Sequence, residues 1–238
     1  MIRAAAFCPH PPVLVPEIAG SGAVSAAAEF DDLRAACRQS IKGVAAAADR
    51  IVLLGTGPMS LAHSPLAHGS LAGYGLPGEI HLGSPACGGT AELPLSLTVG
   101  AWLVRDALGV RSGALGFSVG ADFGGSRAAV DLLALAETTE VALIVMGDGS
   151  ARRDLKAPGY LDDRAAGFDS AVAAALASGD PGELATIDSV LGAELLAAGV
   201  PAWHAAADVL SGTYEAKVDY DAAPYGVAYF AATWLPQG

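Results

Sequence analysis

The sequence predicts a single α/β domain, residues 1–238, with a mixed or mostly parallel central sheet flanked by helices on both faces. Two observations carry this prediction. Runs that are apolar at nearly every position, as in strands buried on both faces, alternate with segments of helical period almost from end to end. The chain also shows no internal repeat and no linker long enough to divide two domains. A domain of this length buries roughly 70% of the surface of its unfolded chain, so it needs no disulfide or metal to fold.

Strands are expected where short apolar runs end in turn-forming residues. Residues 2–7 end at a proline cluster, which cannot continue a sheet, and residues 51–54 end at a Gly-Thr-Gly-Pro sequence. Residues 141–146 form the most hydrophobic run of all, and residues 214–220 alternate between apolar and polar side chains. The expected strands are residues 2–7, 51–54, 79–82, 114–119, 141–146 and 214–220.

Helices are expected where apolar residues recur every three or four positions. The longest, over residues 25–49, has an apolar face formed by Phe30, Leu33, Cys37, Ile41 and Val44. A proline in the first turn is compatible with a helix over residues 92–108. The expected helices are residues 25–49, 92–108, 124–137, 162–176, 182–198, 203–210 and 226–234. Residues 60–89, rich in Gly, Pro, Ser and His, are expected to form a mobile, lid-like stretch.

Composition excludes several classes of protein. Lys and Arg number 13 against 25 Asp and Glu, and the net charge of -12 disfavours both nucleic acid and anionic membranes as partners. Mean hydropathy is +0.44, but alanine inflates it, and no apolar run approaches the roughly 18 residues of a membrane span. The prolines from Pro9 onward come too early for a signal peptide. Cys8, Cys37 and Cys87 are odd in number and far apart, so we expect reduced thiols in a cytoplasmic protein.

In a parallel sheet the ligand lies beyond the carboxyl ends of the strands. Here those ends are residues 8–11, 55–58, 120–123 and 147–150. Three of these loops contain the sequences FCPHPP at 7–12, LGTGP at 54–58 and MGDGS at 146–150, and the sequence APYGV follows later in the chain at 223–227. The series resembles the class III extradiol ring-cleaving dioxygenases, the LigB-like superfamily, and their Memo relatives. Nearly the whole chain resembles a group of proteins with a LigB-like domain of this dioxygenase class, through GDGSARR at 147–153 and APGYLD at 157–162 as well.

The resemblance implies an Fe(II) site in which two histidines and a carboxylate hold the metal. His10 matches the first histidine of that pattern. The second histidine is expected just after the second strand, where this chain has Gly57, Pro58 and Met59. One position of the metal site is therefore filled by residues that cannot bind the metal.

The resemblance also places the acid/base histidine and the last metal ligand. The acid/base histidine falls at Ala151, while Asp148 of the same loop is kept. The last ligand, a carboxylate in the dioxygenases, falls near Asp221, with the register open between Asp219, Tyr220 and Asp221. The predicted metal ligands are thus His10 and Asp221, and the metal is Fe(II) or another divalent ion. Such an incomplete set indicates that ordinary catechol cleavage is absent or much reduced.

Basic residues gather in the loop that follows the fourth of the buried strands. Arg152, Arg153 and Lys156 bring together three of the 13 cationic residues, and guanidinium groups recognise carboxylates and phosphates. Backbone N–H groups near Ser150 can also approach an anion. The equally weighted alternative is that the arginines pair with acidic residues of the same loop. Tyr220 and Tyr225 are candidates for the wall of a pocket.

Three functions follow from these residues. The first is a divergent metal-dependent oxidoreductase acting on a small aromatic or anionic compound, with Asp148 and Arg152 catalytic and with Ser150, Arg153 and Tyr225 binding the substrate. The second is a non-catalytic, Memo-like domain that has lost the metal and binds a small anion or a protein. The third is a hydrolase or transferase that uses Asp148, Ser150 and Arg152. A homodimer is expected from the composition alone.

The remaining histidines and cysteines are open to two readings each. His63, His68 and His81 can replace the missing metal ligand, but their spacing matches no metal motif and favours surface residues. His204 is expected to be structural. Cys8 is either a soft ligand beside His10 or a buried residue at a strand end, and the second is favoured. Cys87 on a loop lacks a visible partner base.

Overall fold

The structure, a computed structural model, describes residues 1–19, 30–83, 92–109, 113–120 and 122–237. Its centre is a seven-stranded sheet in the order β3-β6-β2-β7-β1-β9-β8, and a separate two-stranded sheet contains β4 and β5. The strands are β1 (Ile2–Cys8), β2 (Arg50–Thr56), β3 (Leu61–His63), β4 (His68–Leu71), β5 (Leu76–His81), β6 (Leu115–Val119), β7 (Val141–Met146), β8 (Tyr214–Ala222) and β9 (Tyr229–Pro236).

The sheet is mixed, as the sequence predicts. Strands β6, β2, β7 and β1 run parallel to one another, whereas β3 at one edge and β9 and β8 at the other add antiparallel pairs. The described helices are α2 (Asp31–Ala45), α3 (Leu95–Leu108), α4 (Arg127–Thr138), α5 (Ala165–Ser178), α6 (Pro181–Ala185), α7 (Ser189–Glu194) and α8 (Val200–Val209).

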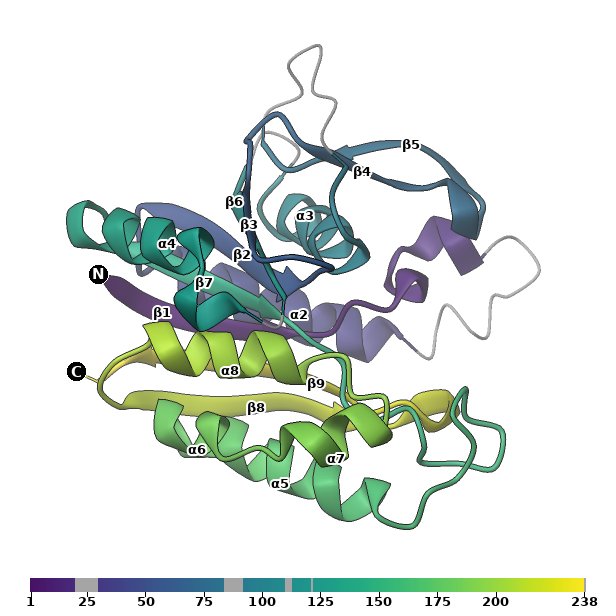
Figure 1. Cartoon of the computed structure of the whole chain (residues 1–238). Coiled ribbons are helices and arrows are strands. Elements are labelled where there is room, and N and C mark those ends of the chain that lie inside the picture. The colour runs from purple at the N-terminus through teal and green to yellow at the C-terminus, as the bar shows by residue number, and fades with distance from the viewer. Residues whose placement is uncertain (20–29, 84–91, 110–112, 121, 238) are drawn as a thin grey trace.

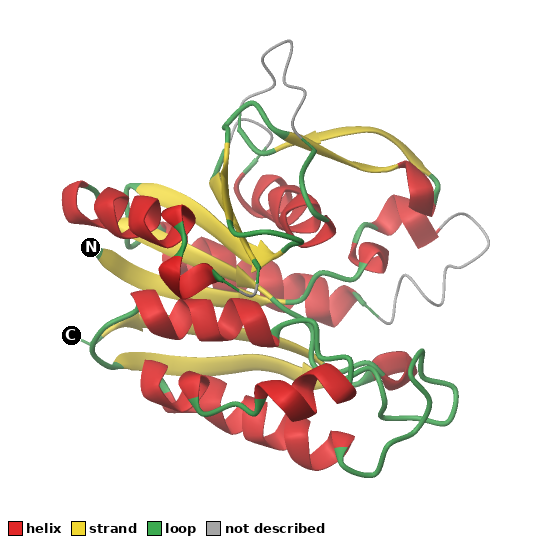
Figure 2. Ribbon diagram, in the orientation of Figure 1, coloured by secondary structure: helices red, strands yellow, loops and turns green. Residues whose placement is uncertain are grey.

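Helices cover both faces of the sheet, and each face has its own apolar core (Figures 1 and 2). One core joins the sheet to α4, α5 and α8 and contains Phe7, Phe230 and Trp234. The other joins it to α2 and α3 and contains Cys8 and Tyr229. Every residue of β7 is buried, because this strand lies in the middle of the sheet with a helical layer on either side.

Two expectations about the C-terminal half are wrong. Residues 226–234 are not a helix, because Tyr229–Pro236 forms strand β9 between β1 and β8. Residues 182–198 do not form one helix but two short ones, α6 and α7, and the second begins at the capping carboxylate of Asp188. Strands β3 and β4 are not among the expected elements, and residues 25–29 of the first expected helix lie outside the described residues.

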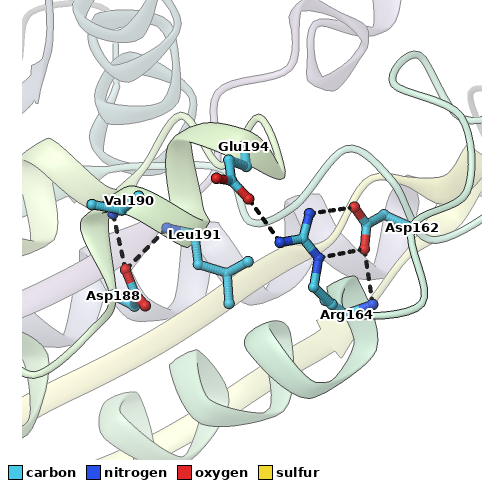
Figure 3. A network of polar contacts seen from close by, with 6 residues as sticks. All are labelled: Asp162, Arg164, Asp188, Val190, Leu191 and Glu194. Atoms are coloured by element: carbon cyan, nitrogen blue, oxygen red, sulfur yellow. Dashed lines mark hydrogen bonds and ion pairs between the residues drawn. The ribbon is translucent and has the colours of Figure 1, made fainter.

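An ion-pair network connects the loop before α5 to α7 (Figure 3). Both carboxylate oxygens of Asp162 accept hydrogen bonds from the Arg164 guanidinium, and Glu194 of α7 accepts another at 2.7 Å. These bonds from Arg164 lower the pKa of Asp162 to about 2. These contacts connect α7 to the loop that follows β7.

Among the described helices, none has both the length and the apolar character that crossing a membrane requires.

Candidate functional site

His10 and Asp148 meet where β1 and β7 end side by side. The backbone N–H of His10 donates to Asp148 Oδ1 at 2.7 Å, and His10 Nδ1 lies 3.5 Å from the same oxygen. The His10 side chain is 10% exposed, and within the described residues its Nδ1 is buried without a hydrogen-bond partner. The parallel register that pairs Cys8 with Met146 explains why residues 138 positions apart in the sequence come together.

Burial dominates the electrostatics of this pair. It raises the pKa of Asp148, and the neighbouring His10 opposes that shift through its charge and its backbone N–H. Burial and the Asp148 charge together raise the pKa of Tyr229. Cys37 of α2 has a raised pKa because its thiol interacts with Cys8 and is buried. Cys8 therefore contacts Cys37, and both are free thiols; Cys87 lies outside the described residues.

The structure does not bring the two predicted metal ligands together. Asp221 pairs across the β8–β9 register with Phe230, which belongs to the core on the α5 and α8 face. The Asp148 carboxylate beside His10 acts instead on Cys37 and Tyr229, on the α2 and α3 face. Residues paired across two strands point to the same face, so Asp221 lies on the α5 and α8 face. The Asp148 carboxylate beside His10 lies on the opposite, α2 and α3 face.

The alternative carboxylate, Asp219, is also engaged elsewhere. It forms an ion pair with Lys217 and accepts a hydrogen bond from Thr233 at 3.3 Å. Within the described residues, His10 belongs to no group of three His, Cys, Asp or Glu side chains whose ligand atoms lie within 4.8 Å of one another. One imidazole and one carboxylate do not fit the two histidines and carboxylate that an Fe(II) site of the extradiol type requires.

The predicted substrate-binding residues Ser150 and Arg153 are held by Asp169 of α5. The buried Asp169 carboxylate accepts the Ser150 hydroxyl at 2.6 Å, the Ser150 backbone N–H at 2.9 Å and Arg153 Nη1 at 3.1 Å. Asp221 lies near this cluster, since burial first and then Asp169 raise its pKa while Arg153 lowers it. Ser150 is fully buried, so its hydroxyl has a structural partner rather than a position facing solvent.

Arg152, predicted to be catalytic, lies beside Asp162. The Arg152 carbonyl accepts the Asp162 backbone N–H at 3.0 Å, and the Arg152 charge helps to lower the pKa of Asp162. In the described part of the chain its Nε is buried without a hydrogen-bond partner. Arg153 is therefore paired with an acidic residue, but with Asp169 of α5 and not with one of the same loop. Within the described residues Arg152 lies near Asp162 without forming an ion pair.

Residues 195–199 lie across the carboxyl ends of β2 and β7. The Gly199 N–H donates to the Asp148 carbonyl at 2.8 Å, the Ala151 N–H donates to the Leu195 carbonyl at 3.0 Å, and the Thr56 hydroxyl donates to the Ala198 carbonyl at 2.9 Å. A Cβ at Gly147 would lie 2.6 Å from the Gly199 Cα. Backbone from the chain itself therefore fills the position above β7.

A cavity of about 500 Å³ lies beside this segment, at the ends of β2 and β6. Its polar groups include Thr56, the last residue of β2, and His204 and Asp208 one turn apart on α8. His204 Nε2 lies 2.8 Å from the Ile187 carbonyl, which can only accept, so Nε2 carries the proton. The remaining lining is mostly small or apolar: Val119, Gly120, Phe123, Gly124, Ser189, Ala193, Ala197, Ala198, Val200, Pro201 and Ala205.

A second cavity, about 380 Å³, lies between the loop after β7 and the segment that follows β8. Arg153, Lys156 and Tyr225 line it together with Asp154, Ala223 and Gly226. Tyr225 has a φ of 55°, which is uncommon for a residue other than glycine, and its ring stacks on Phe30 at 6.1 Å. Two of the residues predicted to bind substrate, Arg153 and Tyr225, thus come together here.

No protein-family model matches the chain, and no curated protein matches its sequence. Its fold is that of an uncharacterized protein of known structure, JW3007 from Escherichia coli K12. The two share 14% sequence identity and a TM-score of 0.52 over 98% of this chain and 99% of the other. At that identity the likeness establishes a common fold over the full length.

Sequence reasoning misses two groups of residues. His204, expected to be structural, does bond the Ile187 carbonyl, but it also lines the 500 Å³ cavity with Asp208. Their spacing of four residues on a helix is the signal that points to a shared face. The spacing of His68 and His81 favours surface residues, yet the structure places them together with Glu79. Their sequence spacing holds no such signal, because a hairpin makes the contact.

Proposed function

We propose that this chain is a ligand-binding member of the LigB-like superfamily that takes a small hydroxylated aromatic molecule, such as a phenol or catechol, in the 500 Å³ cavity. The observation that carries the proposal is the cavity's position beyond the carboxyl ends of β2 and β6, where open α/β sheets bind their ligands. Its volume falls within the range of small-molecule sites, which are mainly apolar with a few polar groups.

The polar groups of the cavity favour a neutral ligand that donates hydrogen bonds. With the proton of His204 on Nε2, its Nδ1 is an acceptor, and the Asp208 carboxylate can only accept. Phe123 adds an aromatic wall. Phenolic hydroxyl groups satisfy both acceptors, whereas a carboxylate ligand is repelled by Asp208. The lining therefore supports a phenol over a benzoate.

Ring cleavage is not part of this proposal. Extradiol chemistry needs a metal held by two histidines and a carboxylate, and His10 and Asp148 offer one of each with Asp221 on the opposite face. The loop sequences that resemble those of the dioxygenases support membership of the superfamily. The few metal-binding side chains at the strand ends support ligand binding without ring cleavage.

Calorimetric titration with catechol, phenol, benzoate and cyclohexanol tests the proposal. Catechol and phenol are expected to bind more tightly than benzoate and cyclohexanol. Ala193→Leu, which fills the cavity from an exposed position on α7, is expected to weaken binding at least tenfold. Ala166→Leu, at an exposed position of α5 away from the cavity, is the matched control and should bind as the parent does. Binding of none of the four with a Kd below about 1 mM, or unchanged binding by Ala193→Leu, contradicts the proposal.

A second candidate is a small-anion site at the cavity of Arg153, Lys156 and Tyr225. The observation favouring it is Lys156, because in the described residues no carboxylate oxygen lies within ion-pair distance of its side-chain nitrogen. Phosphate binding that is weakened by Lys156→Gln but not by Lys42→Gln, which removes an equal charge from α2, would support this site. If both variants weaken phosphate binding equally, the binding reflects the loss of a positive charge anywhere on the surface, and the proposed anion site is contradicted.

A further inference from the structure

The hairpin of β4 and β5 brings two histidines and a glutamate onto one face. His68 pairs directly with His81, and Ser70 pairs with Glu79. Residues opposite each other in a ladder share a face, as do residues two apart along a strand. The register alone therefore aligns His68, Ser70, Glu79 and His81 on the same side of this small sheet.

The opposite face of the hairpin is anchored to the rest of the protein. Leu71 and Ile80 are buried on that face, and Gly69 packs so closely on Thr98 of α3 that a Cβ there would clash with the Thr98 side chain. The Leu93 N–H also donates to the His68 carbonyl at 2.9 Å. The histidines and Glu79 are thus presented outward from a hairpin with a fixed position on the domain.

The Glu79 carboxylate lies between the two imidazoles. Its Oε1 is 3.6 Å from His68 Nε2, and its Oε2 is 3.4 Å from His81 Nε2. Both separations exceed the roughly 3.2 Å limit of an N–H···O hydrogen bond, so the three groups face one another without bonding directly. The ring centroids of the histidines are 5.6 Å apart.

These separations match the ligand shell of a tetrahedral metal. Ligands that lie about 2.0–2.1 Å from a tetrahedral zinc are themselves about 3.3–3.4 Å from one another. The three ligand atoms already lie within 4.8 Å of one another, and in the described residues this is the sole group of three that does so. The histidine side chains are 21% and 20% exposed, while Glu79 is 56% exposed and free to adjust its rotamer.

The surroundings add negative charge and room for a further ligand. A cavity of about 450 Å³ is lined by His68, Ser70, Gly78, Glu79 and Glu92. Glu92 is held there by a backbone bridge to His68. Two imidazoles with two nearby carboxylates form an environment that attracts a divalent cation, and the cavity leaves space for water in the fourth position.

We propose that His68, Glu79 and His81 form a zinc-binding site on the β4–β5 hairpin, with water as the fourth ligand and Glu92 contributing charge from the wall of the cavity. Two imidazoles and one carboxylate suit zinc and related divalent transition metals rather than Mg²⁺ or Ca²⁺, which prefer oxygen ligands. The site is separate from the cavity at the ends of β2 and β6, and it stands whether or not that cavity binds an aromatic molecule.

Titration of the chelator-treated, tag-free protein with ZnCl2 at neutral pH tests the site. One zinc per chain is expected, with loss of at least tenfold in affinity in His81→Asn and in Glu79→Gln, and a smaller loss in Glu92→Gln. Co²⁺ in place of Zn²⁺ is expected to give the visible absorption of a tetrahedral complex, and MgCl2 to give no binding isotherm. Glu79→Gln keeps its exposed position, and its thermal unfolding without metal should match the parent.

Two histidine variants serve as matched controls. His63→Asn changes a histidine of strand β3 in the central sheet, outside the cluster, and His10→Ala changes the one at the strand ends. Both are expected to bind zinc as the parent does. Zinc binding that is lost in His10→Ala and kept in His81→Asn overturns the proposal by placing the metal at the strand ends. Absence of stoichiometric zinc binding by the folded parent overturns it outright.

Discussion

The Asp148 carboxylate accepts the backbone N–H of His10 at 2.7 Å, and this bond ties the loop after β7 to the loop after β1. The same carboxylate is 15% exposed and lies within reach of the His10 ring. An acidic group at the centre of the strand ends therefore has a structural role. Replacing Asp148 with asparagine or with alanine separates this structural role from the effect of its charge.

Asp148→Asn is expected to raise stability at neutral pH. Burial raises the pKa of Asp148 above 3.8, so the folded state binds its proton more tightly than the unfolded state does. The ionised carboxylate consequently lowers the free energy of unfolding at neutral pH, and that loss is recovered as the pH falls through the folded-state pKa. Asparagine keeps an acceptor for His10 without the charge. Urea unfolding at pH 7 and pH 5 measures the difference.

Asp148→Ala provides the contrast, because it removes the acceptor as well. It is expected to lower the free energy of unfolding by about 1–3 kcal/mol, the cost of leaving a buried donor unsatisfied. Equal destabilisation by Asp148→Asn and Asp148→Ala would show that the charge, and not the acceptor, holds the two loops together.

Asp169→Ala is expected to destabilise the fold by about 3 kcal/mol. The buried carboxylate is shared by Ser150 and Arg153, so its removal leaves a hydroxyl, an amide and a guanidinium without their partner. Ser150→Ala removes one of these bonds and is expected to cost about 1 kcal/mol. Denaturant unfolding of both variants and of the double variant measures the coupling. Strictly additive losses would mean that Ser150 does not depend on Asp169.

His63→Gln is expected to flatten the pH dependence of stability on the acid side. Burial lowers the pKa of His63 below 6.5, so the folded state binds fewer protons than the unfolded state there. Stability present above pH 6.5 is lost as the pH falls toward the folded-state pKa. Glutamine retains a partner for the Ser118 hydroxyl, which lies 3.0 Å from His63 Nε2. Unfolding curves at pH 7.5 and 5.5 that remain equally far apart in the variant would rule out His63 as the cause.

Gly147→Ala is expected to lower stability by about 1–3 kcal/mol, because the added methyl group meets Gly199 and Trp203 at the end of β7. Gly167→Ala is its control. Gly167 lies within α5, and a methyl group added there would have no neighbour within 4 Å, so alanine should stabilise the helix by about 0.5–1 kcal/mol. Thermal unfolding compares the two variants. If Gly147→Ala leaves the stability unchanged, residues 195–199 move easily to accommodate the methyl group.

The central strands are predictable from sequence because burial on both faces leaves few ways to arrange their residues. Val141–Met146 has the bounds that its apolar run indicates. Strand β9 is not predictable in the same way. Its alanines suit a helix, and only its position between β1 and β8, with Phe230 and Trp234 on one face and Tyr229 on the other, decides for a strand.

The two candidate sites differ in the same way in how far the sequence predicts them. Sequence places His10 and Asp148 at the carboxyl ends of two strands, and the parallel pairing of β1 and β7 brings them together. The cluster of His68, Glu79 and His81 depends instead on an antiparallel register between two short strands. A change of one residue in that register would turn the side chains of one strand to the other face, so no spacing in the sequence reveals the cluster.

Residues 195–199 occupy backbone hydrogen-bonding groups at the end of β7 that a ligand would otherwise contact. Their effective concentration there is set by the connection to α7 and α8 and does not dilute with the protein. A freely diffusing molecule that contacts the Asp148 and Ala151 backbone must first displace bonds the chain makes with itself. Selection for a new ligand at this edge would therefore act first on the length and sequence of the α7–α8 connection, and only afterwards on the residues of the strand ends.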